Sequence, residues 1–363
     1  MYILIAILVF GFLIFIHELG HYIAARLCHV HIHEFSIGMG PKLVWYTSKK
    51  TGIVYALRMF PIGGFVSMLG ENPDEDDNRP RPETMPDGAP FDPSTSLSAK
   101  PAWQRFIVNV AGASMNLLLG FLVMAILTVF STLGTNHVNG FYRDKDTPDQ
   151  PSISETQGLM RGDEILAVNG EKVHIPDELF YEMTMQGTEP MDLLVRRGDD
   201  TLHITLTLPT EVDEQSGIKY AVPDFFVTPI EHKTVGVVAK QAFYKCVWVV
   251  EMIWESLFDL VSGKYTVDAL SGPVGTAGAI SDAAKDGWET FALMVVVISV
   301  NLGIFNLLPL PALDGGHLLL ILIEMVTRKK VSPKVGAIVD AIGLMLLFGL
   351  MIFVTIKDVI KLI

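Results

Sequence analysis

The sequence predicts a multi-pass α-helical membrane protein with four transmembrane helices and a separate α+β domain. Half of the 363 residues are hydrophobic, and the mean hydropathy of +0.40 is too high for an ordinary soluble protein. Four charge-poor segments each reach the roughly 20 apolar residues that a bilayer crossing needs. A long polar segment with alternating strand and helix patterns separates the second segment from the third.

The four predicted spans are located from runs without charged residues. The first covers residues 1–27, and because no basic region or cleavage site accompanies its apolar run, we expect a retained helix rather than a signal peptide. The second lies within 107–134 and the third within 290–317. The fourth lies within 335–361 and carries one acid, Asp340, in its apolar part.

The distribution of basic residues predicts the orientation of the chain. The loop 318–334 between the third and fourth spans holds four basic residues, which is typical of a cytoplasmic loop. Four crossings then place both termini outside the cytoplasm and the loop 28–106 inside it. In the segment 235–289, Glu251, Glu255 and Asp259 repeat at every fourth position and aromatic residues supply an apolar counterpart, which favours an amphipathic helix on the membrane surface over a tilted span.

The net charge and the cysteine count exclude two classes of function. A formal net charge of −13 leaves no basic stripe that could neutralise phosphates, so we expect no nucleic-acid partner. Cys28 and Cys246 are the only cysteines, which excludes a disulfide framework and a cysteine-based zinc site.

Within the first span, His17, Glu18 and His21 form the pattern His-Glu-x-x-His. On a helix, residues four apart lie on one face, so both imidazoles can bind one Zn²⁺ while the adjacent Glu18 serves as general base. The alternative is that the histidines pack against other helices without binding metal. Ionisable side chains at this depth are costly and mark functional sites, which favours the metal.

A catalytic zinc site needs a third protein ligand and an open position. Asp314 ends the third span, which crosses in the same direction as the first, so its carboxylate is expected at the depth of the histidines. Pro309 and Pro311 must break the helix just before it. Broken backbone at membrane depth is tolerated where it lines a cavity or is buried in protein. The alternative for Asp314 is an ordinary helix cap.

These two motifs carry a resemblance to a known family. His17 to His21 (HELGH) and residues 306–315 (NLLPLPALDG) are similar to the signature motifs of the site-2 proteases, which are intramembrane zinc metalloproteases. The resemblance continues through residues 34–43, 61–71, 100–112 and 270–275 and so covers nearly the whole chain. It is strongest to the bacterial branch with an extracytoplasmic PDZ domain, the regulator of sigma-E protease type.

The resemblance implies a zinc metalloendopeptidase of the bacterial inner (plasma) membrane, acting in regulated intramembrane proteolysis. Its substrates would be pre-cleaved single-span membrane proteins, such as anti-sigma factors or remnant signal peptides, met within the lipid bilayer. Zinc would be held by His17, His21 and Asp314, with Glu18 as the catalytic acid/base, while Asn306, Pro309 and Pro311 would help to position the substrate strand.

One motif departs from the family. The second span usually contains Gly-Pro-x-x-Asn, whereas this chain has Gly112-Ala113-Ser114-Met115-Asn116. Without the proline, the local kink and any role of Asn116 stay open.

The first cytoplasmic loop contains a predicted β-hairpin and a linker. Residues 51–69 alternate in polarity before Pro61 and the pair Gly63-Gly64, and a proline favours an edge strand. By resemblance this membrane-associated hairpin would hold an unwound substrate through β-addition, and a purely structural hairpin is the alternative. Residues 71–100 are rich in acids and prolines and predict a flexible linker.

The segment 135–230 resembles a single PDZ domain, with a strand, a turn at Asn169-Gly170, a helix and two further strands expected in that order. It would filter substrates by size or bind a ligand, and a folded spacer is the alternative. His29, His31 and His33 alternate, which favours a solvated strand face over a second metal site.

Overall fold

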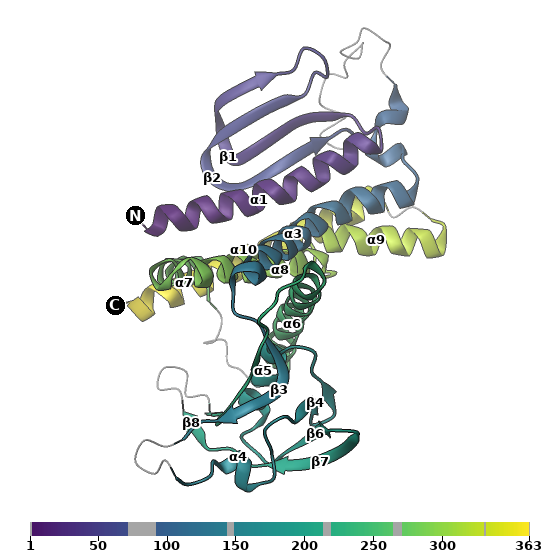
Figure 1. The fold of residues 1–363 in the computed structure, drawn as a ribbon. Coiled ribbons are helices and arrows are strands. Elements are labelled where there is room, and N and C mark those ends of the chain that lie inside the picture. Colours follow the sequence, from purple (N-terminus) through teal and green to yellow (C-terminus); the bar gives the residue numbers. More distant parts are fainter. Residues whose placement is uncertain are drawn as a thin grey trace. The chain divides into compact units, whose positions relative to one another are not determined.

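The computed structural model describes residues 2–71, 92–143, 149–212, 219–263, 271–329 and 332–362, and Figure 1 shows their elements. The predicted linker 71–100 falls mostly outside these residues. The chain divides into two compact units, which are Met1–Val123 with Ile253–Ile363, and Met124–Met252.

Four helices in the described part of the chain are long and apolar enough to cross a membrane. They are α1 (Tyr2–Leu27), α3 (Ala102–Phe130), α8 (Trp288–Leu307) and α10 (Pro333–Leu362). Their number and places in the chain agree with the four predicted spans. Large apolar side chains on their outer faces, such as Leu8 of α1 and Leu346 of α10, are exposed and suit contact with lipid.

Small residues let these helices approach closely in the first unit. A side chain at Gly20 of α1 would overlap the carbonyl group of Ala111 on α3. A side chain at Gly303 of α8 would crowd the carbonyl group of Ala113, which is also on α3. Helices in membranes associate through such contacts because lipid removes the hydrophobic driving force. α3 is therefore packed by backbone contact against α1 and against α8.

Between α8 and α10, the structure contains a helix where a loop was predicted. α9 spans Asp314–Thr327, and its buried Leu318 and Ile321 lie three residues apart on one face. The prediction treated 318–334 as a loop because of its basic end and overlooked this apolar periodicity. Arg105 at the start of α3 pairs with Glu324 of α9 at 2.5 Å.

A second helix that was not predicted, α7 (Pro273–Asp286), lies within the segment 235–289. Its first turn is held by α10, because the backbone N–H of Gly275 donates to Asp358 Oδ2 over 2.8 Å. A carboxylate at this place satisfies an N–H group that the helix itself leaves unpaired.

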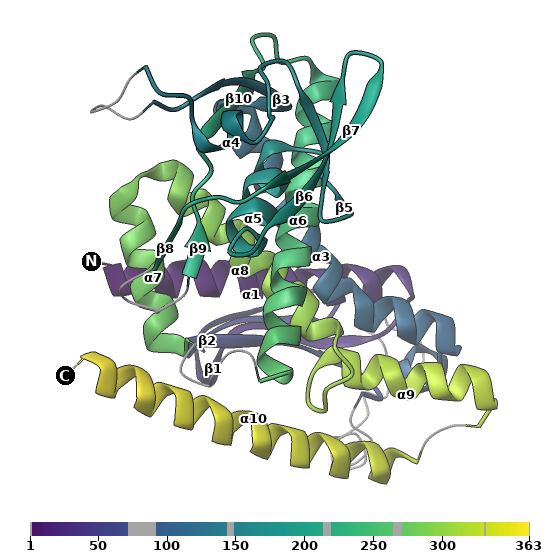
Figure 2. The same cartoon turned by 90° about the horizontal axis from the view of Figure 1, so that it is seen from below.

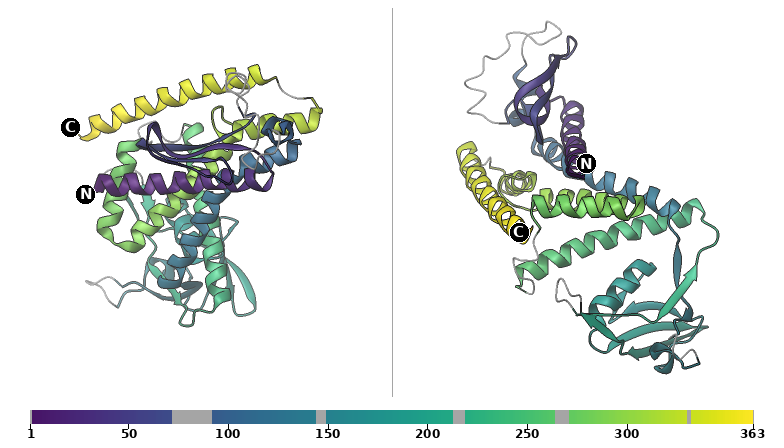
Figure 3. Two further views of the ribbon diagram at one scale, coloured as in Figure 1. Left: turned by 90° about the horizontal axis from the view of Figure 1, so that it is seen from above. Right: turned by 90° about the vertical axis from the view of Figure 1, so that its left-hand side faces the viewer.

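The hairpin of the first unit is wider than predicted. β1 (Ile32–Thr47) and β2 (Val54–Met68) form a folded-over antiparallel ribbon, in which residues 32–37 pair with 64–68 and residues 34–37 pair with 54–57 as well. The prediction placed both strands within 51–69, because alternation identifies a strand but does not identify its partner. The ribbon lies against α1 (Figure 3) and shares a buried cluster with it.

The second unit is built on a six-stranded antiparallel sheet with the order β10-β3-β4-β6-β7 and β5 beside β4. α5 lies against the sheet (Figure 2), and Leu179 and Met183 of that helix are fully buried in the core. The strand–turn–helix–strand–strand order from β4 to β7 agrees with the predicted order. The main elements are β3 (Gly134–Phe141), β4 (Glu164–Val168), β5 (Glu171–Lys172), α5 (Pro176–Gln186), β6 (Met191–Arg197), β7 (Asp200–Leu206) and β10 (Phe225–Pro229).

The short elements of this unit are α4 (Ile153–Thr156) and the pair β8 (Thr210–Val212) and β9 (Lys219–Ala221). α6 (Val235–Val261) is a single continuous helix. Its first half is attached to the beginning of α5 by the ion pair of Lys245 with Asp177 at 3.0 Å.

Candidate active site

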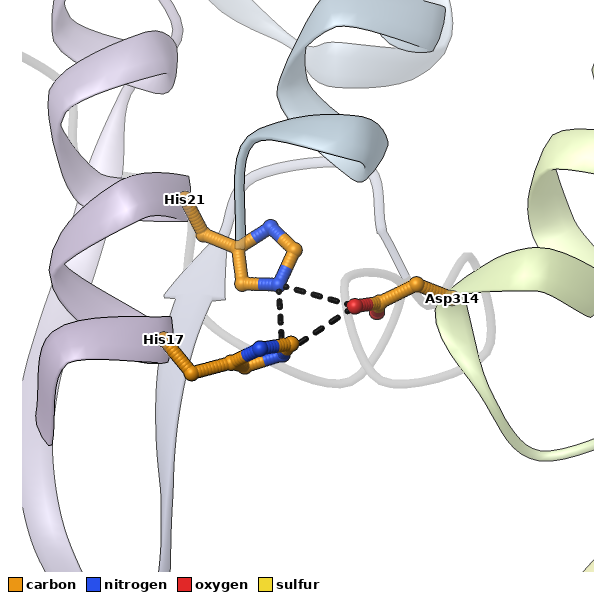
Figure 4. A group of neighbouring side chains, drawn as sticks. All are labelled: His17, His21 and Asp314. Carbon is orange, nitrogen blue, oxygen red and sulfur yellow. Dashed lines mark hydrogen bonds and ion pairs between the residues drawn. The ribbon is translucent and has the colours of Figure 1, made fainter. Parts of the chain in front are cut away.

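Two histidines on α1 converge with an aspartate at the start of α9 (Figure 4). Nε2 of His17 and Nε2 of His21 lie 3.1 Å apart, because helical spacing places the two rings on one face, where they meet edge to face. Oδ2 of Asp314 lies 3.1 Å from the first nitrogen and 3.2 Å from the second. Both imidazoles are buried, and the carboxylate is largely shielded.

The geometry of these three atoms suits a tetrahedral metal ion. Nitrogen and oxygen ligands lie about 2.0–2.2 Å from zinc, which separates neighbouring ligand atoms of a tetrahedron by about 3.3 Å or slightly more. The three observed separations are 3.1, 3.1 and 3.2 Å. Oδ2 of Asp314 is buried and has no hydrogen-bond partner among the described residues. In the described part of the chain, this is the group of His, Cys, Asp and Glu side chains that could hold a metal ion.

The chain reaches Asp314 through a tight loop. α8 ends at Leu307, and the backbone then folds back over the first turn of α9. A side chain at Gly315 would overlap the carbonyl group of Leu308, and one at Gly316 would crowd the carbonyl group of Leu310. Only glycine permits this close approach, so the two glycines after Asp314 let the loop fold back against the helix that begins at the carboxylate.

The outer nitrogens of both imidazoles are also engaged by α3. His21 donates from Nδ1 to the backbone carbonyl of Val108 over 2.8 Å. Nδ1 of His17 lies 3.3 Å from the side-chain amide of Asn116, which is fully buried. Such contacts fix the tautomer and the orientation of metal-binding histidines.

The amide orientation at Asn116 follows from this chemistry. If Nε2 of His17 binds a cation, its Nδ1 carries the proton and needs an acceptor. The Asn116 Oδ1 atom is buried without a partner, and a half-turn of the amide brings that oxygen to His17. Sequence reasoning left the role of Asn116 open because of the missing proline, yet α3 continues unbroken through Ala113 and still presents the amide to the imidazole.

Glu18 lies next to β2 and beside His17, His21 and Asp314, which together form the candidate ligand group. Its side chain passes Gly64, where an added Cβ atom would come within 3.1 Å of Glu18 Cγ. The backbone N–H of Val66 donates to the carboxylate, which also interacts electrostatically with both histidines and Asp314. A carboxylate in this place can exchange protons with a molecule bound at the three ligand atoms.

The other predicted site residues lie around the loop between α8 and α9. Asn306 is in the last turn of α8 and is partly buried, whereas Pro309 is exposed. Pro311 packs against Gly343 of α10. Gly63 precedes the strand segment beside Glu18 and has a left-handed φ of 82°.

The second histidine-rich stretch forms a different arrangement. His29 lies in the turn after α1, while the rings of His31 and His33 meet edge to face with centroids 5.0 Å apart. Burial, then the nearby charges of His33 and Arg26, lower the pKa of His31. These three residues are not part of the candidate metal-binding group.

Comparison with known proteins decides the family. The model of peptidase family M50 matches residues 5–350. The chain belongs to this family, the site-2 proteases. It is 37% identical to a protein of Clostridium perfringens named as a zinc metalloprotease, over 99% of both chains. It is also 30% identical to the regulator of sigma-W protease RasP of Bacillus subtilis, over 97% of both chains. The zinc metalloprotease RasP of Geobacillus kaustophilus is 29% identical, over 98% of this chain and 97% of that one.

As a site-2 protease, the protein is a zinc-dependent peptidase that works in a membrane on membrane-protein substrates. This agrees with the enzyme class, the cofactor and the family that the two motifs predict. The candidate ligand group lies beside α1 and α3, two helices that can span the bilayer, and its carboxylate comes from the first residue of α9.

Proposed function

We propose that His17, His21 and Asp314 hold the catalytic zinc of this protease and that Glu18 is its acid–base residue. The observation that carries this is the convergence of three ligand atoms within 3.2 Å of one another beside a partly buried glutamate. When bound, zinc supplies Lewis acidity, which activates a carbonyl carbon and acidifies water. Glu18 then takes a proton from the attacking water and delivers it to the leaving amine.

The number of ligands supports a catalytic rather than a structural metal. Structural zinc sites are closed by four protein side chains, whereas catalytic sites use three and leave one position open. Two histidines and one carboxylate form a set of three in the described part of the chain. The Val108 carbonyl and the Asn116 amide, which orient the two rings, both come from α3. Each histidine therefore keeps its Nε2 atom for the metal.

We propose that the substrate binds as a strand along residues 64–68 of β2. Peptide bonds in a helix are hidden by the helical hydrogen bonds, so a transmembrane segment must unwind before water can attack it. β1 pairs with one edge of residues 64–68, and no described strand pairs with the other edge. Gly63 and Gly64 leave the beginning of this segment without side chains, and Glu18 lies next to Gly64. An added strand would find its backbone hydrogen bonds here.

The exposed part of the ribbon supports an association with lipid. The side chains of Val44, Trp45 and Tyr46 on β1 are each more than half exposed. An apolar edge of this kind would aggregate in water but suits a bilayer. We propose that Asn306, Pro309 and Pro311, at the end of α8 and in the loop before Asp314, help to position the substrate strand.

The proposed substrates are single-span membrane proteins that another protease has already shortened. The relative from Bacillus subtilis is named as a regulator of sigma-W, so anti-sigma factors are the first class to test, and remnant signal peptides are the second. The protein would then act in regulated intramembrane proteolysis.

The proposed topology follows the basic residues of the loops. We place the protein in a bacterial plasma membrane with both termini outside the cytoplasm, the loop 28–106 inside, and the sheet unit outside. Within 135–230, the order of strands and the position of α5 support a PDZ domain. Phe243, Trp254 and Phe258 of α6 are exposed and support its place on the membrane surface.

The test uses the full chain purified in detergent. Metal content and cleavage of a single-span substrate are measured for the wild type, Glu18→Gln and Asp314→Asn. We expect one zinc ion per wild-type chain, a zinc-loaded but inactive Glu18→Gln variant, and loss of both zinc and activity in Asp314→Asn. Full activity of Glu18→Gln would remove the proposed acid–base role.

A further inference from the structure

One acid in the apolar part of α10 has contacts outside its own helix. Oδ1 of Asp340 accepts a hydrogen bond from the backbone N–H of Ala312 over 3.4 Å. Oδ2 of the same carboxylate lies 3.7 Å from Nε2 of His317, in the first turn of α9. A carboxylate in a membrane-spanning helix is costly, and its presence there indicates a specific task.

The backbone that Asp340 contacts is strained. Ala312 has a φ of 66°, a left-handed conformation that a non-glycine residue adopts at a cost. It lies two residues before Asp314, in the loop that folds back over α9. Such a conformation persists only where the surroundings hold it, and the carboxylate of Asp340 is bonded to the amide of the strained residue itself.

One turn after Asp340, α10 also contacts the loop that precedes Asp314. An added side chain at Gly343 would overlap Pro311, so the helix offers a notch for the proline and an acceptor for the following amide. A cavity of about 220 Å³ lies beside this contact, and its lining includes Asp340, His317, Glu324 and Arg105. This polar lining makes the charge tolerable within the span.

We propose that Asp340 is a positioning residue, which holds the 308–313 loop by the Ala312 amide and thereby sets the Asp314 carboxylate in place for the metal. This inference rests on the proposed role of Asp314 as a ligand. It assigns to the fourth span a task in building the site, although that span contributes no ligand.

A matched control lies on the same helix. Asp358 also accepts a hydrogen bond from a backbone N–H, that of Gly275 at 2.8 Å, and it is buried whereas Asp340 is partly exposed. At 1.5 Å per residue it stands about 27 Å further along α10 than Asp340. It holds α7 rather than the loop, so it shares the chemistry of Asp340 without the link to the ligand group.

The experiment compares Asp340→Leu, Asp340→Asn and Asp358→Asn in the full-length protein. Zinc affinity is measured by chelator competition, and the visible spectrum of the cobalt-substituted protein reports ligand geometry. We expect Asp340→Leu to weaken zinc binding about tenfold or more, the usual size of lost outer-shell support, and to alter the cobalt bands. Asp340→Asn retains an acceptor oxygen, so it should keep the zinc affinity and the cobalt spectrum of the wild type. Asp358→Asn should also leave the zinc affinity and the cobalt spectrum unchanged.

The backbone conformation supplies a second, independent readout. Ala312→Gly removes the strain, so in the Asp340→Leu background it should recover part of the lost affinity. Hydrogen exchange of residues 308–313 is compared in the zinc-free proteins, where Asp340→Leu should exchange faster than the wild type. Wild-type affinity, an unchanged cobalt spectrum and unchanged exchange in Asp340→Leu would overturn the inference, as would equal losses in Asp358→Asn. A wild type that binds no zinc would refute the proposed function instead, while the exchange comparison still decides the role of Asp340.

Discussion

Two short stretches of this chain combine two histidines with a glutamate, and only one of them builds a candidate metal site. In the first, His17, Glu18 and His21 lie on a helix, so both Nε2 atoms face the same point. In the second, His31 and His33 meet edge to face at the start of β1, and Glu34 follows directly. Composition alone does not separate the two stretches, so the difference must come from what surrounds them.

The surroundings differ in charge. Glu34 is bound by Arg58 at 2.6 Å and by Lys42 at 2.7 Å, so its negative charge is already neutralised by protein. Near Glu18, no described Lys or Arg forms an ion pair with the glutamate or with Asp314. A cation site needs carboxylates whose charge is still free. The partners of a carboxylate, more than its neighbours in sequence, therefore decide whether it can bind a metal ion.

The largest expected effect separates the two stretches directly. His21→Ala removes one of the three proposed ligands, so bound zinc and proteolysis should both fall to background, because a catalytic zinc site uses three protein ligands. His31→Ala, an identical change ten residues later, should keep full zinc content and activity. Metal analysis of the purified proteins measures both. Zinc loss in His31→Ala would erase the proposed distinction.

A second prediction concerns the amide that orients His17. Asn116→Leu keeps the volume but removes the hydrogen bond, and zinc affinity should fall by about 10- to 100-fold. Ser114→Leu is the control, because Ser114 is two residues away on the same helix and exposed. Chelator competition reports the affinities. Equal values for the two variants would show that the buried amide does not support the imidazole.

The third prediction tests the contact between β2 and Glu18. Gly64→Ala places a methyl group about 3.1 Å from Glu18 Cγ and 3.0 Å from the Ser36 carbonyl. We expect kcat to drop severalfold while zinc content stays normal, since the change disturbs the glutamate and not the ligands. Gly11→Ala on α1 meets no neighbour within 4 Å and should be silent. A normal kcat in Gly64→Ala would argue against a working contact.

The smallest effect is expected from the pH dependence of the second stretch. Burial, helped by His33 and Arg26, lowers the pKa of His31 from its usual value of 6.5. The folded state then binds this proton more weakly than the unfolded chain does, so stability is complete above pH 6.5 and declines as the pH falls below it. Melting temperatures at pH 7.5 and 5.5 should differ less in His31→Gln than in the wild type. An identical pH response would show that His31 does not titrate in this window.

The sequence was sufficient for the features that depend on local pattern. Runs without charge located four helices that can span the bilayer, and Pro309 and Pro311 marked the end of α8 before Asp314. The sequence was not sufficient for features that depend on contacts between distant parts of the chain. The strand 54–68 pairs with 32–47 rather than with itself, and α9 was hidden by the basic residues that follow it.

In the candidate site, too, some features could be predicted from the sequence and others could not. Helical spacing and a shared crossing direction predicted that His17, His21 and Asp314 would meet. The carbonyl of Val108 could not be foreseen, because a backbone acceptor leaves no trace in residue type. Asp340 was visible as a lone acid in an apolar run, but its contact with Ala312 depends on the fold of the loop.

The proposed ligands come from α1 and from the first residue of α9, and this has a consequence during synthesis. A ribosome that has released α1 and α3 has produced both imidazoles but no Asp314, so under the proposed assignment the newly inserted fragment would lack one zinc ligand. Peptide-bond hydrolysis would then begin only after Asp314 has been made and has reached the two histidines.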